Sequence, residues 1–463
     1  MNIPTGGAKP NDGYLFGPRA AWFAYAMTIG LMLFDYIDRQ VIVSLFPYMK
    51  TDWGVSDKQL GALVSILSIT IAAFALPVSL VADRVSRVKS IVTMATAWSI
   101  GSISCMFTGN YSTLLAARAA VGVGEAGYGP VGAALIASHF PDRMRSALMG
   151  GFFAAASVGS VLGIALGGVI AARWGWHAAF GVVGIPGLVL SLFYIKVRDY
   201  HTVDLGTPTQ GATRLPAGVV RAAFGALKRS PTLLWVCIGS AVQIIVLSSM
   251  WAWLPSFLNR VHGIAPAQAG VRAAVVVLCG AIGSVVWGVV CDMVGKRYPR
   301  GRVLSMAVLC AVSTSVLGAA FGLPLLGVHL SNQAQFGLFA LGGFFATCTA
   351  GPAVSIVLNV IHPGFRATGA SILGLFQNLF GLAMGPLIAG ALSDAFGLQT
   401  ALTVTPLFGI AAAWMLVIGS RTYERDMKLA AGVPIEDARR AVQASSPGGV
   451  AMLIERPAAF VRK

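Results

Sequence analysis

Twelve mostly apolar segments recur between residues 20 and 420, each long enough to cross a lipid bilayer as a helix. A helix needs about 20 apolar residues to span the hydrocarbon layer. Only 11% of the 463 residues are charged, against about 25% in soluble domains. The sequence therefore predicts an all-α membrane protein with spans near 20–47, 59–82, 90–108, 113–139, 146–172, 178–195, 232–258, 268–291, 303–322, 334–361, 367–393 and 401–420.

The spans divide into two six-helix halves that repeat each other. VADRVSRVK at 81–89 follows the second span and VCDMVGKR at 290–297 follows the eighth, which places Asp83 and Asp292 209 residues apart. PDRMRSA at 141–147 and HPGFRAT at 362–368 precede the fifth and eleventh spans. Further pairs at matching separations are Gly61 with Gly270, Arg145 with Arg366, and Gly168 with Gly390. Two pseudo-symmetric halves with a binding site between them are typical of transporters.

Charge asymmetry predicts the orientation. Loops after even-numbered spans hold 16 Lys and Arg, and loops after odd-numbered spans hold 4. The positive-inside rule then places both termini in the cytoplasm. The expected parts are a tail at 1–19, a half at 20–195, a linker at 196–231 with an amphipathic helix at 216–231, a half at 232–420 and a disordered tail at 421–463.

The net charge of +16 is assigned to loops beside anionic lipid, so no nucleic-acid partner is expected. The first 18 residues lack an apolar core, and we expect no signal peptide. The six cysteines lie in or beside apolar spans without CxxC spacing, so we predict neither disulfides nor a metal or other cofactor. We expect a monomer in a bacterial inner membrane.

The fourth predicted span carries two charges, Arg118 and Glu125, seven residues apart on one helix face. Charge at bilayer depth is costly and usually faces an interior path. Its glycines predict close packing and a break in helix regularity. GVGEAG also fits a dinucleotide-binding fingerprint, but no strand precedes it, so that interpretation is rejected.

The first span reads GLMLFDYIDRQVIVSLFP and places Asp35, Asp38 and Arg39 on one helix face. From helix rise, Asp35 and Glu125 are predicted at one depth, with Arg39 and Arg118 nearer the outside. An ionised Glu125 is expected to compete with substrate for Arg118. The alternative is that each acid pairs with an arginine purely for structure, although buried ion pairs seldom repay their desolvation.

The repeated charged turns predict a cytoplasmic gate, in which a carboxylate among basic side chains latches neighbouring helices. Its expected members are Asp83, Arg84, Arg87, Arg145, Asp292, Lys296, Arg297 and Arg366. Glycines four apart in the fifth and eleventh spans predict tight helix contact, with a hinge as the alternative.

The C-terminal half lacks deep charges but offers polar and aromatic side chains for a softer cavity wall. Expected wall residues are Gln243, Trp251, Trp253, Thr347, Thr349, Ser355, Asn359, Gln377 and Asn378, with the tryptophans alternatively anchoring the membrane interface. Arg272, at the start of the eighth span, is expected to extend outward to the interface.

With these residues the chain resembles the major facilitator superfamily. Its charged turns are similar to that family's G-x-x-x-D-[RK]-x-G-[RK]-[RK] motif, with departures at Ser79, Ser86 and Met293. The fifth span resembles an antiporter motif but has Ile164 in place of its proline, so exchange is not inferred.

Within the superfamily, DYIDRQ at 35–40 and ARAAVGVGEAGYGPVGAALIASHF at 117–140 resemble the Spinster group of lysolipid and sphingoid-lipid transporters. The resemblance implies a proton-linked carrier with Asp38, Arg39, Arg118 and Glu125 in its site, and Tyr128 ends the same pattern. Asp35 stands where the group commonly has Asn, and it joins Glu125 and Asp38 as a proton-coupling residue.

The predicted function is secondary active transport by alternating access, coupled to protons, of an anionic or zwitterionic amphiphile such as a lysophospholipid. The alternatives are a proton-coupled carrier of a small organic anion and a multidrug efflux antiporter. The sequence contains no nucleophile–base pair or metal set that would indicate an enzyme.

Overall fold

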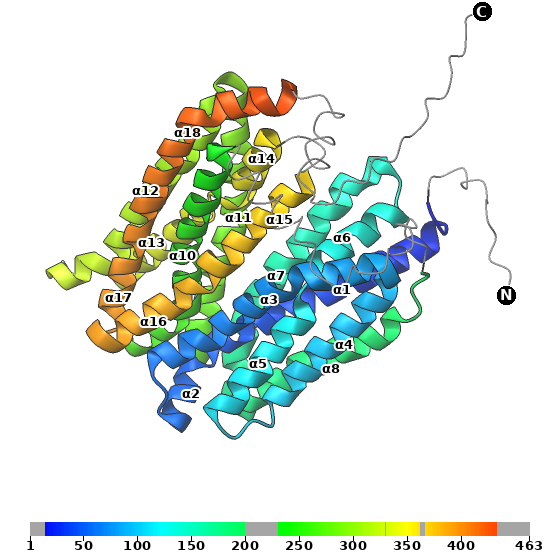
Figure 1. Cartoon of the computed structure of the whole chain (residues 1–463). Coiled ribbons are helices and arrows are strands. Elements are labelled where there is room, and N and C mark those ends of the chain that lie inside the picture. Colours follow the sequence, from blue (N-terminus) through cyan, green and yellow to red (C-terminus); the bar gives the residue numbers. More distant parts are fainter. Residues whose placement is uncertain (1–13, 200–229, 329, 362–365, 433–463) are drawn as a thin grey trace, which may run out of the picture.

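The computed structural model describes residues 14–199, 230–328, 330–361 and 366–432 as a bundle of helices. The linker helix predicted at 216–231 and the tail beyond 432 lie outside the described residues, apart from the last two linker positions. Figure 1 shows the two halves side by side, and no described residue is in a strand. This confirms the predicted all-α fold of two six-helix halves.

Eight α-helices form the described N-terminal half and nine form the C-terminal half. The first eight are α1 (Pro18–Val41), α2 (Phe46–Trp53), α3 (Asp57–Val85), α4 (Arg87–Cys105), α5 (Tyr111–Glu125), α6 (Tyr128–His139), α7 (Asp142–Trp174) and α8 (Trp176–Tyr194). The others are α10 (Pro231–Arg260), α11 (Pro266–Arg297), α12 (Pro299–Gly322), α13 (Asn332–Ala346), α14 (Ala350–Val360), α15 (Arg366–Phe376), α16 (Met384–Phe396), α17 (Leu398–Val404) and α18 (Phe408–Gly432).

Ten helical segments of the described chain are long and apolar enough to cross a membrane. The two remaining predicted spans are α4 and the α5–α6 pair, which brings the spanning elements to the predicted twelve. α18 continues to Gly432, past the predicted end of the last span at residue 420.

Three spans are interrupted near their middles. The fourth breaks between α5 and α6, where Gly127 has φ 91°, a backbone conformation that favours glycine. The tenth breaks between α13 and α14. The eleventh contains a π-helix, η4 (Gln377–Leu382), between α15 and α16. Such interruptions often mark functional positions in helices.

Glycines let α7 pack directly on α1. A Cβ built on Gly159 or Gly163 would lie 2.5 or 2.6 Å from the carbonyl oxygen of Leu33 or Ile37. In the other half, a Cβ on Gly385 would lie 2.7 Å from the carbonyl oxygen of Ile245 on α10. The predicted tight helix contact is therefore confirmed in both halves.

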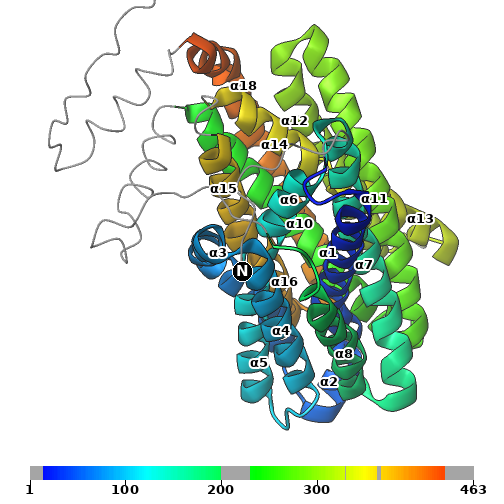
Figure 2. The same ribbon diagram turned by 90° about the vertical axis from the view of Figure 1, so that its right-hand side faces the viewer.

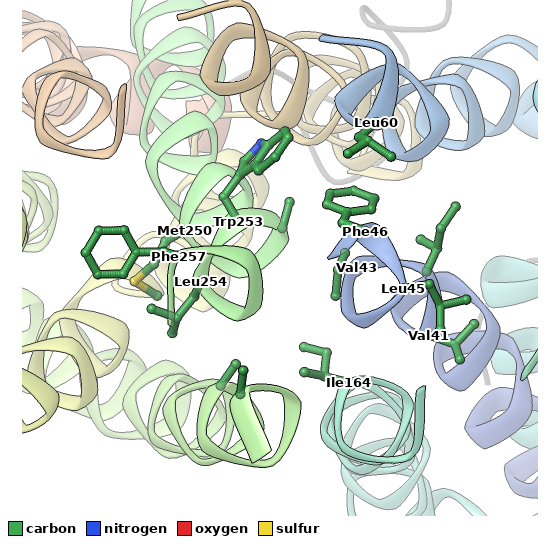
Figure 3. Packing of buried hydrophobic residues seen from close by; sticks show 14 of the residues in the cluster. Val41, Val43, Leu45, Phe46, Leu60, Ile164, Met250, Trp253, Leu254 and Phe257 are labelled. Carbon is green, nitrogen blue, oxygen red and sulfur yellow. The ribbon is translucent and has the colours of Figure 1, made fainter. Parts of the chain in front are cut away.

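The two halves meet at one end of the bundle, which we call the closed end. It contains α2, the start of α3 and the turn between α16 and α17 (Figure 1). One cluster of buried apolar residues there draws on both halves, and Phe46 and Trp253 face each other with ring centroids 5.1 Å apart (Figure 3). The other two clusters lie each within one half.

Four glycines of the sequence repeat allow the halves to touch at the closed end. A Cβ built on any of them would overlap a backbone oxygen of the opposite half: Gly61 on Pro386 (2.3 Å), Gly390 on Asp57 (2.4 Å), Gly270 on Ile164 (2.8 Å) and Gly168 on Pro266 (2.9 Å). The repeat visible in the sequence is therefore also a repeat of the contacts between halves.

We expect Gly390→Ala to open the closed end, because its methyl group cannot fit against the Asp57 carbonyl. Spin labels at the exposed positions Phe107 and Leu326, one in each half, should report a longer mean distance. Gly374→Ala is the matched control, because nothing lies within 4 Å of a Cβ built there. An unchanged distance distribution in Gly390→Ala would contradict this role.

Candidate functional site

The charged residues predicted in the first and fourth spans form one buried cluster where α1 meets α5. α1 contributes Asp35, Asp38 and Arg39 from adjacent turns, and α5 contributes Arg118 and Glu125. Asp35, Asp38 and Glu125 are each 1% exposed and Arg118 is 0% exposed. Removing five ionisable groups from water is costly unless they pair, and these five pair in two subsets.

The first subset is centred on the guanidinium group of Arg39. Its Nε lies 3.0 Å from Oε2 of Glu125, and its Nη2 lies 3.1 Å from Oδ2 of Asp35. The ring of Tyr36 lies beneath the same group, with its centroid 4.9 Å from the guanidinium carbon. One cation therefore serves two carboxylates on different helices, which confirms that Asp35 and Glu125 lie at one depth.

The second subset joins Arg118 to Asp38. Nη1 of Arg118 lies 3.5 Å from Oδ2 of Asp38 and 3.4 Å from its backbone oxygen. Ser102 on α4 donates a short hydrogen bond to the other carboxylate oxygen. Nε and Nη2 of Arg118 have no hydrogen-bond partner among the described residues. Asp38 thus has partners on both α4 and α5, while two nitrogen atoms of the Arg118 guanidinium group remain available as hydrogen-bond donors.

The predicted competition for Arg118 is wrong in one respect, because the partner of Glu125 is Arg39. Two helical turns separate Arg118 from Glu125 along α5, or about 10 Å. Side chains that reach between α1 and α5 instead bring Arg39 to Glu125 and Asp38 to Arg118, while α1 packs mainly on α7 and α8 and α5 packs on α3 and α4. Helix periodicity determined which residues share a face, and interhelix packing determined which residues pair.

The cluster is unbalanced in charge. Three carboxylates and two guanidinium groups leave one excess negative charge when all five are ionised, and one bound proton neutralises it. Asp38 and Arg118 form a one-to-one pair, so the excess falls on Asp35 and Glu125, which share Arg39. The Arg39 side chain is 18% exposed, whereas those of its partners are 2% or less. Arg39 is therefore the member that a ligand reaches first.

Other predicted substrate residues lie apart from this cluster. The Tyr128 hydroxyl donates to the backbone oxygen of Thr28 at 2.6 Å, and its ring packs on Trp98. Gln243 is 0% exposed and donates to Ser313 and to the Ala346 carbonyl, within the C-terminal half. These contacts occupy the Tyr128 hydroxyl and the Gln243 amide nitrogen, whereas Oε1 of Gln243 has no hydrogen-bond partner among the described residues.

Trp253 lies at the closed end, where its Nε1 donates to the Pro386 carbonyl at 3.0 Å. Asn359 on α14 and Gln377 at the start of η4 are half-buried. The predicted charged residues of the first and fourth spans therefore lie in one cluster, whereas the predicted polar residues of the C-terminal half lie at separate places in that half.

The predicted gate residues are only partly described. The side chains of Asp83, Arg84 and Arg366 lie outside the described part of the structure. Arg87 is half-buried, Arg145 donates to the Phe140 carbonyl at 3.2 Å, and Lys296 and Arg297 are exposed. Asp292 pairs with Arg302 at 3.0 Å, across the turn between α11 and α12.

A polar network at the closed end was not predicted. The Asp57 carboxylate accepts from Lys50 of its own half at 2.6 Å, and from Arg260 at 2.7 Å and Ser393 at 2.5 Å in the other half. In return, the Asp394 carboxylate accepts from the backbone N–H groups of Asp57 and Lys58, each at 2.8 Å. The capping pattern of Ser56 and Gln59 marks this helix start in the sequence, but nothing there indicates partners in the opposite half.

The architecture and the buried charge cluster define a two-half membrane carrier. A model of the Major Facilitator Superfamily matches residues 28–328, and the chain belongs to this family. Spinster proteins are among the members of the family to which the chain is similar.

Three similar proteins illustrate this relationship. An MFS-type efflux pump of Mycolicibacterium smegmatis is 27% identical over 452 residues, covering 95% of this chain and 100% of the pump. Protein spinster of Drosophila melanogaster is 24% identical over 404 residues, covering 85% of this chain and 65% of spinster. The crystal structure of a bacterial homologue of the human lysosomal transporter Spinster, inward-facing and unoccupied, matches with a TM-score of 0.77 and 22% identity. That match covers 89% of this chain and 99% of the other.

Proposed function

We propose that this protein is a proton-coupled carrier that moves an anionic or zwitterionic amphiphile, such as a lysophospholipid, by alternating access. The observation that carries the proposal is the shared pairing of Arg39 with Asp35 and Glu125, at 3.1 and 3.0 Å. It combines a partly exposed cation, which can bind an anionic headgroup, with two buried carboxylates that compete for the same cation.

Coupling follows from that competition. When an anionic headgroup binds Arg39, it removes the favourable partner of Asp35 and Glu125. A buried carboxylate that loses its cation is stabilised by taking up a proton. Substrate and proton therefore bind together. With a zwitterionic headgroup, one proton neutralises the single excess negative charge of the cluster, so the loaded site can cross the occluded state without an uncompensated charge. An anionic headgroup adds a second negative charge, which requires a second proton.

The orientation comes from the distribution of charge. Loops after odd-numbered spans carry 4 Lys and Arg against 16 in the others, and the closed end is built from the poorly charged loops. By the positive-inside rule this end faces away from the cytoplasm, with both termini cytoplasmic. The described conformation is then inward-facing, in the inner membrane of a bacterium.

The location of the charges favours an amphiphile over a compact anion. A small organic anion is best held by cations from both halves, yet Arg39 and Arg118 both belong to the N-terminal half. In the described C-terminal half, Arg260 and Arg272 lie at helix ends. One charged wall facing a softer wall fits a headgroup joined to an apolar chain. A cationic drug is a less favourable substrate, because Asp35 and Glu125 already pair with Arg39.

The test is uptake by purified protein in proteoliposomes with an imposed pH gradient. Radiolabelled lysophosphatidylglycerol should accumulate above its equilibrium level when the gradient is present, and should only equilibrate when an ionophore dissipates the gradient. Benzoate and a lipophilic cation serve as probes for the alternative substrate classes. Accumulation of either probe without lysophosphatidylglycerol would overturn the proposed substrate class. Equal accumulation with and without the gradient would overturn proton coupling.

A further inference from the structure

A polar pocket lies at the closed end, entirely within the C-terminal half. It forms between the end of α10, the start of α11 and the start of α13, which pack together (Figure 2). Its volume is about 170 Å³, and it is lined by Leu258, His262, Ile264, Arg272, Asn332, Gln335, Phe336 and Phe339. Drug-sized ligands need about 300 Å³ or more, so this pocket can hold a single chemical group of a larger molecule.

The polar lining is basic or neutral and contains no carboxylate. Arg272 is exposed and makes no ion pair with any described residue, so its guanidinium group is available for a bidentate contact with an anion. Nε2 of His262 is buried and has no hydrogen-bond partner in the described part of the chain. Gln335 already donates to the Ala320 carbonyl at 2.9 Å. Nε2 of His262 is thus a buried polar atom without a partner, beside the exposed side chains of Arg272 and Asn332.

An exposed apolar stripe on α11 begins beside Arg272. Val271, Val275, Leu278 and Ile282 are 46%, 44%, 47% and 54% exposed. Their spacing places them on one face of the helix, where they run along the lipid-facing surface for about three turns. Arg272, which lines the pocket, is the sequence neighbour of Val271, the first residue of this stripe. A basic pocket beside an exposed apolar helix surface suits a charged headgroup joined to an apolar chain.

We propose that this pocket binds a phosphate group, held by Arg272, His262 and Asn332. The apolar stripe favours the phosphate of an anionic phospholipid over free phosphate. This site is separate from the Arg39 cluster, which lies in the other half, and it does not depend on the proposed substrate.

The protonation of His262 provides a second readout. Burial and the neighbouring guanidinium group of Arg272 lower the pKa of this histidine below its ordinary value. No other titratable side chain lines the pocket in the described chain. A bound phosphate favours the protonated imidazole and raises that pKa again. Phosphate binding should therefore take up a proton and become tighter as the pH falls from 8 towards 6.

The experiment measures binding to full-length protein in an uncharged detergent by isothermal titration calorimetry. The probes are short-chain phosphatidylglycerol, short-chain phosphatidylcholine and inorganic phosphate. We expect phosphatidylglycerol to bind and Arg272→Gln to weaken its affinity about tenfold or more, since a charge-assisted hydrogen bond is lost. His262→Gln should remove the pH dependence. Asn332→Ala changes an exposed residue and gives an independent test if another variant folds poorly.

Arg173→Gln is the matched control, because Arg173 is exposed at the same end of the bundle but lies in the other half. Binding of phosphatidylglycerol without inorganic phosphate supports a lipid headgroup as the source. Binding of both supports the same phosphate chemistry from a soluble source. Absence of phosphatidylglycerol and phosphate binding overturns the proposal, and so does equal loss of affinity in Arg272→Gln and Arg173→Gln.

Discussion

Replacing Glu125 with Gln is expected to abolish uphill transport driven by a proton gradient while preserving substrate binding. The substitution mimics a permanently protonated acid of nearly the same shape. Arg39 keeps Asp35 as its partner at 3.1 Å, so the headgroup site is retained. The substitution removes the excess negative charge of the cluster and leaves two carboxylates with two guanidinium groups, so the ratio of affinities at pH 6 and pH 8 should fall to about one.

The measurement pairs substrate binding at two pH values with accumulation in vesicles under an imposed pH gradient. Glu424→Gln is the matched control, because Glu424 pairs with Arg300 outside the cluster and its side chain is 38% exposed. Its transport should equal that of the unmodified protein. If Glu125→Gln still concentrates substrate in response to the gradient, the coupling proton resides elsewhere. Asp35→Asn then tests the acid that shares Arg39.

Replacing Arg118 with Ala is expected to lower the free energy of unfolding by about 3–5 kcal/mol, the range found when one member of a buried ion pair is removed. Arg118 is 0% exposed and is the principal cation beside Asp38, which is itself 1% exposed. The structure therefore assigns Arg118 a different first effect from the loss of substrate binding that the sequence predicts. The check is denaturant or thermal unfolding in detergent.

A double-mutant cycle separates stability from binding. Asp38→Asn combined with Arg118→Ala removes the orphaned charge, while the Asn side chain can still accept from Ser102. The double variant should be more stable than Arg118→Ala alone. If Arg118→Ala instead unfolds like the unmodified protein but binds no substrate, Arg118 is a substrate contact and Arg39 is not the sole headgroup partner.

Apolar segments, charge asymmetry and the internal repeat were sufficient to predict the fold from the sequence. These signals are local or compositional: a bilayer admits only long apolar helices, and each such helix can be recognised without knowledge of its neighbours. The repeat also identified Gly61, Gly168, Gly270 and Gly390 before their contacts were known. Similarly, intramembrane charges identified the members of the buried cluster, because charge at that depth is rarely tolerated without a role.

Tertiary structure alone decided which charges pair and where the halves meet. The pairing of Arg39 with Glu125 depends on how the bundle places α1 relative to α5, and the Asp57 network links Asp57 to Arg260, which lies 203 positions later in the chain. Helix periodicity specifies the face on which a residue lies, but not the partner helix or its register. Those depend on the packing of many side chains at once. The sequence by itself thus determined the spans and the charged faces, and interhelix packing decided the chemistry between them.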